Sequence, residues 1–120
     1  MISSRRTGKR GEEVAAAYLE RLGYQVLEHN FRTRFAELDL VCRHGPDLVF
    51  VEVKARTSHR FGLPEEAVTS RKRQKLRLAI SQYLETYSPR FRRLRLEVLA
   101  IDLQAGSLAV QDIRHIKDIY

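Results

Sequence analysis

The chain has 120 residues, a net charge of +7 and 43% hydrophobic residues. This length suits one domain with a single core, and the hydrophobic content argues against a disordered chain. The excess of Lys and Arg favours a polyanionic partner, with nucleic acid first and an acidic membrane surface second. A single cysteine, Cys42, excludes an internal disulfide, and no apolar run approaches the ~20 residues of a membrane span. We therefore expect a cytoplasmic protein that does not use a membrane.

The N-terminal half predicts an arm, one helix and three strands. Residues 1–8 are polar and basic and predict a flexible arm, without the apolar segment of a secretory signal. Apolar residues at helical spacing predict a helix from about Lys9 to Leu22, ended by Gly23. Glu12 is expected at the edge of its apolar stripe, where the side chain can face inward. Apolar residues predict strands over 24–31, 35–43 and 48–56, and in the second of these they alternate with polar residues.

The C-terminal half predicts a second helix and two further strands. Thr69 or Ser70 can cap a helix that continues to about Tyr87. Its buried face is expected to consist of Leu76, Ala79, Ile80, Tyr83, Leu84 and Tyr87. Two strands are expected afterwards, over 94–102 and 108–114. The order α-β-β-β-α-β-β predicts a single α/β domain, residues 1–120, in which helices pack on a mixed sheet.

The strand over 48–56 contains two charges that its surroundings do not explain. Its other residues predict a strand covered on both faces: Leu48, Val49, Phe50, Val51 and Val53. Glu52 and Lys54 are two residues apart, so their side chains point to the same face. Because burying unpaired charge is costly, a compensating group is needed, and a divalent cation on the carboxylate is one candidate.

Three carboxylates and one lysine are expected to converge on this strand. The hairpin formed by the second and third strands brings Asp39 near the level of Glu52, and Glu37 shares a strand face with Asp39. Glu12 can reach that face from the end of the first helix. Such oxygen ligands suit Mg²⁺ or Mn²⁺. A bound cation would polarise a phosphodiester and activate water, and Lys54 would orient that water or stabilise the transition state.

The sequence resembles two groups of proteins through these residues. Asp39 followed by Glu52-Val53-Lys54 is similar to the PD-(D/E)XK motif of restriction-endonuclease-like nucleases. More closely, and over nearly its whole length, the chain resembles the YraN-like family of small bacterial proteins. The matching stretches are Gly8-Lys9-Arg10-Gly11-Glu12-Glu13, Leu22-Gly23-Tyr24, Glu37-Leu38-Asp39-Leu40, Val51-Glu52-Val53-Lys54 and Phe61-Gly62-x-Pro64-Glu65-Glu66-Ala67-Val68, with Lys72 and Leu76.

The resemblance implies a restriction-endonuclease-like fold and a metal site. It extends to archaeal Holliday junction resolvases, which combine a helical glutamate with the aspartate and the Glu-x-Lys. The expected ligands of Mg²⁺ or Mn²⁺ are Asp39, Glu52, the Val53 carbonyl and Glu12. Lys54 is expected to assist the reaction, and Glu37 to support the ligands. The family usually has glycine before Glu37, whereas this chain has Ala36, whose methyl group would narrow the space beside the sheet.

A basic run begins the second predicted helix, with five positive charges in two turns: Arg71, Lys72, Arg73, Lys75 and Arg77. Such a run is usually a solvated helix face. Here no acidic residue stands four positions away, and positive charge at a helix N-terminus opposes the dipole. That local cost favours phosphate binding, with Arg71, Lys72, Arg73 and Lys75 as the expected contacts. The segment Arg90-Phe91-Arg92-Arg93 carries the same signal more weakly.

These patterns lead to one hypothesis and several alternatives. The sequence predicts a Mg²⁺-dependent hydrolase that cleaves phosphodiester bonds in structured or branched DNA, and two-site junction cutting would favour a homodimer. The main alternative is a DNA- or RNA-binding module that keeps the fold without turnover. A small interaction subunit explains the charge poorly. Asp39 and the Glu52-x-Lys54 pair alone also fit a solvated strand face with an ordinary ion pair, and the four histidines lack zinc spacing.

Overall fold

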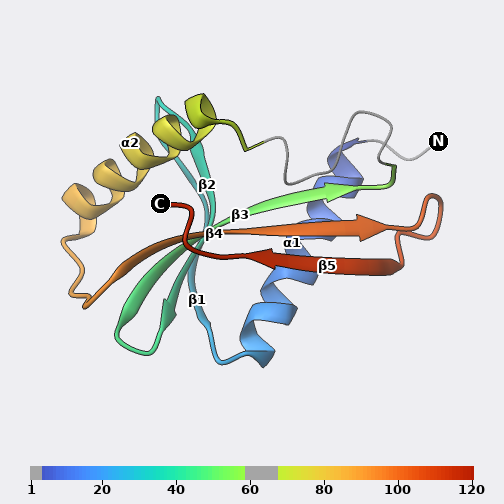
Figure 1. Ribbon diagram of the computed structural model, residues 1–120, viewed down its shortest axis with the longest axis horizontal. Coiled ribbons are helices and arrows are strands. Elements are labelled where there is room, and N and C mark those ends of the chain that lie inside the picture. Colours follow the sequence, from blue (N-terminus) through green and yellow to red (C-terminus); the bar gives the residue numbers. More distant parts are fainter. Residues whose placement is uncertain (1–3, 59–67) are drawn as a thin grey trace.

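The computed structural model describes residues 4–58 and 68–120 as a five-stranded sheet with a helix on each face (Figure 1). The elements are α1 (Ser4–Arg21), β1 (Gln25–Arg32), β2 (Glu37–His44), β3 (Asp47–Arg56), α2 (Ser70–Tyr87), β4 (Leu94–Leu103) and β5 (Val110–Ile116). The predicted order α-β-β-β-α-β-β and the mixed α/β architecture are confirmed. Part of the family motif, residues 61–67, lies outside the described residues.

The strands follow one another across the sheet in chain order, from β1 at one edge to β5 at the other. β3 and β4 are parallel, and the other neighbouring pairs are antiparallel. A parallel pair needs a crossover connection, and the segment that contains α2 provides it. β3 therefore lies in the centre, and its residues from Asp47 to Glu52 are buried. This burial agrees with a strand covered on both faces.

Two hydrophobic clusters occupy the two faces of the sheet, because successive residues of β3 point to opposite sides. On one face Val14, Ala15 and Leu19 of α1 pack on a set that includes Leu40, Cys42, Val49 and Val51. On the other face Leu76, Ala79, Ile80 and Tyr83 of α2 pack on a set that includes Val41, Leu48 and Phe50. Cys42 is fully buried.

Two details of the helices differ from the prediction. α1 begins at Ser4, so residues 4–8 are helical and the predicted flexible arm was wrong there. Arg and Lys have good helix propensity, which allows a polar segment to extend the helix. Tyr87 was expected in the buried face of α2 but is 52% exposed, because it lies in the last turn, beyond the cluster. Thr69 is the N-cap, and its side chain accepts a hydrogen bond from the Lys72 N–H.

Gly11 fixes the distance between α1 and β3. It is buried, and a Cβ atom added there would collide with the Cβ of Ala55. The missing side chain therefore lets the helix lie directly against the strand and brings the neighbouring Glu12 to the sheet. In the parts of the chain that the structure describes, neither helix is long and apolar enough to cross a membrane.

Candidate metal centre

Three carboxylates meet where β2 begins. Glu12 comes from α1, and Glu37 and Asp39 come from β2. Each offers one oxygen, and these oxygens all lie within 4.8 Å of one another. All three residues are half-buried, so the group lies at the surface and is open to a ligand. The convergence of Glu12 with the strand carboxylates agrees with the helical phase expected from the sequence.

Asp39 is fixed against β3 by the backbone. The Val53 N–H donates a hydrogen bond to Asp39 Oδ2 at 2.8 Å. The last register pair of the hairpin is Leu40 with Val51, so the next level of the ladder sets Asp39 beside Glu52. The expected proximity of the two carboxylates is therefore present. Val53 contributes its amide to this arrangement.

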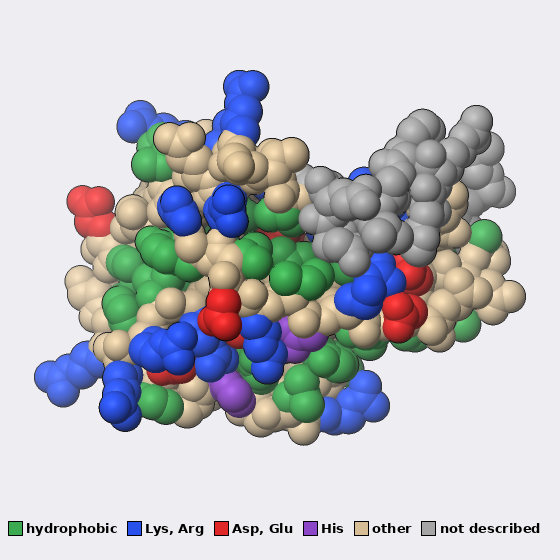
Figure 2. Space-filling model, in the orientation of Figure 1, with side chains coloured by type: hydrophobic (Ala, Val, Ile, Leu, Met, Phe, Trp, Pro, Cys, Tyr) green, Lys and Arg blue, Asp and Glu red, His purple; other side chains and the backbone are tan. Residues whose placement is uncertain are grey.

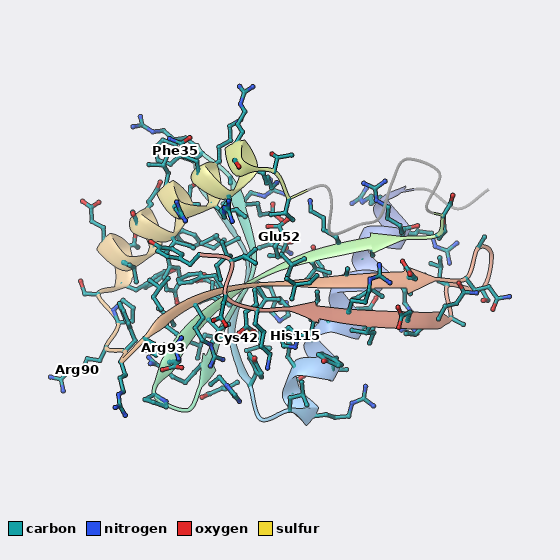
Figure 3. All side chains as sticks on the ribbon, viewed as in Figure 1. Phe35, Cys42, Glu52, Arg90, Arg93 and His115 are labelled. Carbon is teal, nitrogen blue, oxygen red and sulfur yellow. The ribbon has the colours of Figure 1, made fainter. Side chains whose placement is uncertain are left out.

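Glu52 is the buried member of the site. It lies on β3, its side chain points to the same face as Phe50 and α2, and the side chain is 5% exposed (Figure 3). Lys54 Nζ lies 3.3 Å from Glu52 Oε1, whereas Oε2 has no hydrogen-bond partner among the described residues. A buried carboxylate oxygen without a partner carries a desolvation penalty, which a cation or a proton would relieve.

Asn30 is a member of the site that the sequence patterns do not reveal. It lies between the register pairs His29–Leu40 and Phe31–Leu38, and its φ of 53° places it in the left-handed region. With the amide turned to satisfy both partners, its nitrogen donates to Glu37 Oε1 at 3.0 Å and to Glu12 Oε1 at 3.1 Å. Asn30 therefore holds together two carboxylates that come from different elements.

Glu37 also forms an ion pair with an exposed arginine, Arg32. Arg32 Nε lies 3.1 Å from Glu37 Oε2, and the arginine side chain is largely exposed. An exposed ion pair of this kind contributes little stability. Glu37 was expected only to support the ligands, but the structure places its carboxylate within the three-membered group itself.

Burial and nearby negative charge raise the pKa of two carboxyl groups of the site, those of Asp39 and Glu12. Burial, followed by the nearby charge of Glu52, raises the pKa of Asp39 from 3.8 to about 8. Burial also raises the pKa of Glu12, where the Asn30 hydrogen bond opposes the shift and the charge of Glu37 adds to it. Asp39 and Glu12 therefore bind a proton more readily than ordinary carboxylates do, as expected of buried groups with like charges nearby.

The methyl group of Ala36, where the family usually has glycine, has a definite place. Ala36 is half-buried and packs against the cluster under α2. Its carbonyl accepts hydrogen bonds from the Thr33 N–H at 3.1 Å and from the Thr33 hydroxyl at 2.8 Å. These bonds close the turn directly before Glu37, and the methyl group of Ala36 contributes to the core.

The basic run occupies the first two turns of α2, as predicted. Its first turn contains no acidic residue. Arg71, Lys75 and Arg77 are exposed, and Lys72 and Arg73 are half-buried. Figure 2 shows Lys and Arg side chains around α2 and a second gathering at the lower left of the same face. α2 packs on the face of the sheet that carries Glu52.

The donor set fits a hard divalent cation. Carboxylate oxygens are the ligands that Mg²⁺ and Mn²⁺ prefer, and the unpartnered, buried Glu52 Oε2 lies beside a carboxyl of raised pKa. Glu12, Glu37 and Asp39 would hold such a cation. Glu52 is not one of these three, but its carboxylate lies next to that of Asp39.

Comparison with known proteins places the cluster inside a family. The model of the "Uncharacterised protein family UPF0102" matches residues 11–101, a range that contains every carboxylate of the site. A UPF0102 protein of Syntrophomonas wolfei is 46% identical over 110 residues, which are 92% of this chain and 96% of that protein. One of Syntrophus aciditrophicus is 41% identical over 114 residues, 95% and 90% of the two chains. One of Rhodococcus opacus is 38% identical over 113 residues, 94% of each.

Proposed function

The chain belongs to the uncharacterised protein family UPF0102, and we propose that it is a divalent-metal-dependent nuclease acting on structured or branched DNA. The observation that carries the proposal is the meeting of Glu12, Glu37 and Asp39 within 4.8 Å, beside a buried Glu52 that is paired with Lys54. A bound Mg²⁺ or Mn²⁺ would polarise the phosphodiester and lower the pKa of a bound water.

Asp39, Asn30 and Lys54 would then have different roles in the reaction. Asp39 is held by the Val53 amide, which fixes one of its carboxylate oxygens. Asn30 sets the spacing of Glu12 and Glu37. Lys54 is half-buried, with its side chain 24% exposed, and its ammonium group would stabilise the negative charge that develops on the phosphorus oxygens.

The charge of the chain supports nucleic acid as the substrate. The net charge is +7, and α2 begins with a basic run and no acidic residue in its first turn. Cations gathered on one face attract phosphates and release counterions on binding. We propose Arg71, Lys72, Arg73 and Lys75 as phosphate contacts. Cutting a four-way junction needs two active sites, which a homodimer would supply, and we propose that the protein acts in the cytoplasm.

A cleavage panel tests the proposal. Wild-type protein would be incubated with duplex, flap and four-way DNA in Mg²⁺ and in Mn²⁺, and compared with Glu52→Ala and Lys54→Ala. We expect both variants to lose cleavage and to retain most DNA binding, because affinity comes from the basic surface and these groups serve the reaction.

A non-catalytic DNA- or RNA-binding module is the alternative, and one observation favours it. The carboxylates already have protein partners: the Asn30 amide for Glu12 and Glu37, the Val53 amide for Asp39, and Lys54 for Glu52. The cluster could thus persist without a cation. Wild-type protein that binds DNA and leaves every substrate intact in both cations would decide for this alternative.

A further inference from the structure

The segment between α2 and β4 carries a group of cations that the proposed site does not use. Arg90, Arg92 and Arg93 are all exposed, and Phe91 between them is 39% exposed. Arg90 and Arg93 lie at the end of the molecule away from Glu52 (Figure 3). We call residues 88–93 the arginine loop.

The backbone of the arginine loop is held at three points. Ser88 adopts a φ of 44° and its N–H donates to the Leu84 carbonyl at 2.8 Å, which ends α2. The Arg92 N–H donates to the Pro46 carbonyl at 2.8 Å, and the Arg93 carbonyl accepts from the Leu48 N–H at 2.9 Å. A fixed loop loses little backbone entropy when it binds a partner.

The charge of the arginine loop is largely uncompensated. Within residues 4–58 and 68–120, its ion pair is Arg93 with Asp118 at 3.9 Å, and both side chains are well exposed. A pair of that kind contributes little. The nearby Asp47 is already bound to Arg95 at 3.0 Å. Arg90 and Arg92 therefore present their charge to an external anion.

We propose that the arginine loop binds the phosphate backbone of duplex DNA on one flank of the reacting phosphate, a proposal that rests on the proposed function. The loop contacts Pro46, which is six residues before Glu52 along the chain. At about 3.3 Å per strand residue, this separates the loop from the site by about 20 Å. For a duplex that runs along β3 and rises about 3.4 Å per base pair, the contacted phosphates lie roughly six base pairs from the site.

The salt dependence of DNA binding tests this assignment. Fluorescence anisotropy would follow wild type and Arg90→Ala/Arg92→Ala on a duplex of about 20 base pairs, long enough to span both surfaces. Losing two phosphate contacts should lower the slope of log K against log salt by about 1.8, at ~0.9 per phosphate. Arg21→Glu is the matched control, because it also lowers the net charge of +7 by two, from an exposed position on α1.

The outcomes separate this inference from the proposed function. A lower slope in the loop variant and an unchanged slope in Arg21→Glu would support the arginine loop as a contact. Equal effects in both variants, or none in the loop variant, would overturn it. If wild type binds DNA and Lys72→Ala/Arg73→Ala alone lowers the slope, the loop assignment fails and the proposed function stands. If wild type binds no DNA, both fail.

Discussion

The backbone N–H of Val53 donates a hydrogen bond to Asp39 Oδ2 at 2.8 Å. This bond joins β2 to β3 just beyond the last register pair of the hairpin, Leu40 with Val51. It holds the half-buried Asp39 carboxylate beside the buried Glu52, so two acidic groups lie next to each other. The stability of the fold and the chemistry of the site are therefore coupled at Asp39.

Asp39→Asn should stabilise the protein when divalent cations are removed. Asparagine keeps an oxygen that can accept from Val53, removes one negative charge, and brings a donor toward the unpartnered Glu52 Oε2. We expect its melting temperature in chelator above pH 8 to exceed that of wild type by roughly 4 °C, equivalent to about 1 kcal/mol. Most substitutions destabilise, so a gain would be informative. A lower melting temperature would mean that the carboxylates do not repel as inferred.

The pH dependence of stability should reveal the ionisation of Asp39. Burial and the charge of Glu52 raise the pKa of Asp39 from 3.8 to about 8 in the folded state. Between these two values the folded protein binds a proton that the unfolded chain has lost. The contribution of this proton to the free energy of unfolding is therefore full below pH 3.8, falls as the pH rises, and is gone above about pH 8. Denaturant unfolding in chelator across that window should show this decline in wild type. Asp39→Asn should lack it, and identical pH profiles would refute the assignment.

Close packing of α1 on β3 predicts a pair of compensating substitutions. Gly11→Ala should destabilise the protein by about 1–3 kcal/mol, because the new methyl group would collide with Ala55. Ala55→Gly should restore part of that loss in the double variant, since it removes the colliding atom. Gly8→Ala is the matched control, because nothing lies within 4 Å of its added Cβ. Thermal unfolding of the four variants checks the prediction, and additive losses without rescue would contradict it.

A buried network on the α1 side of the sheet gives a separate stability prediction. Glu97 is 1% exposed, and its Oε1 accepts from the Tyr24 hydroxyl at 2.8 Å and lies 2.8 Å from His115 Nε2. Tyr24→Phe should cost about 1–3 kcal/mol, because a buried carboxylate loses a donor. Tyr87→Phe, at an exposed tyrosine, should change stability by less than about 0.5 kcal/mol. Equal effects of the two substitutions on the unfolding free energy would refute this role of Glu97.

Much of the fold follows from local patterns in the sequence. The continuous apolar run of the central strand and the helical spacing in α1 and α2 reflect burial directly, so the element order was predictable. The turn between β2 and β3 fixes the register, and the register brings Asp39 beside Glu52. Helical phase was enough to direct Glu12 inward.

Other features depend on contacts that no local pattern encodes. Asn30 reaches two carboxylates because its backbone adopts a positive φ. Asparagine tolerates this conformation, but its presence in a sequence does not predict it. Glu37 joins the cluster through the geometry of the strand start. Glu97 is buried among Tyr24 and His115, which come from two other segments, and Arg95 of its own strand, and its position in β4 gives no sign of the two distant partners. Such long-range polar contacts become visible only in the assembled fold.

Binding of Mg²⁺ or Mn²⁺ measured by calorimetry, in wild type, Asp39→Asn and Glu85→Gln, tests the central claim most directly. Glu85 is an exposed glutamate on α2, so its variant removes one charge away from the cluster. The carboxylate cluster predicts saturable binding in wild type and in Glu85→Gln, and an affinity about tenfold or more weaker in Asp39→Asn. Saturating cation should also stabilise wild type by about 2.7 kcal/mol at a hundredfold excess over Kd. No binding of either cation to wild type, or equal binding to Asp39→Asn, would contradict the metal centre.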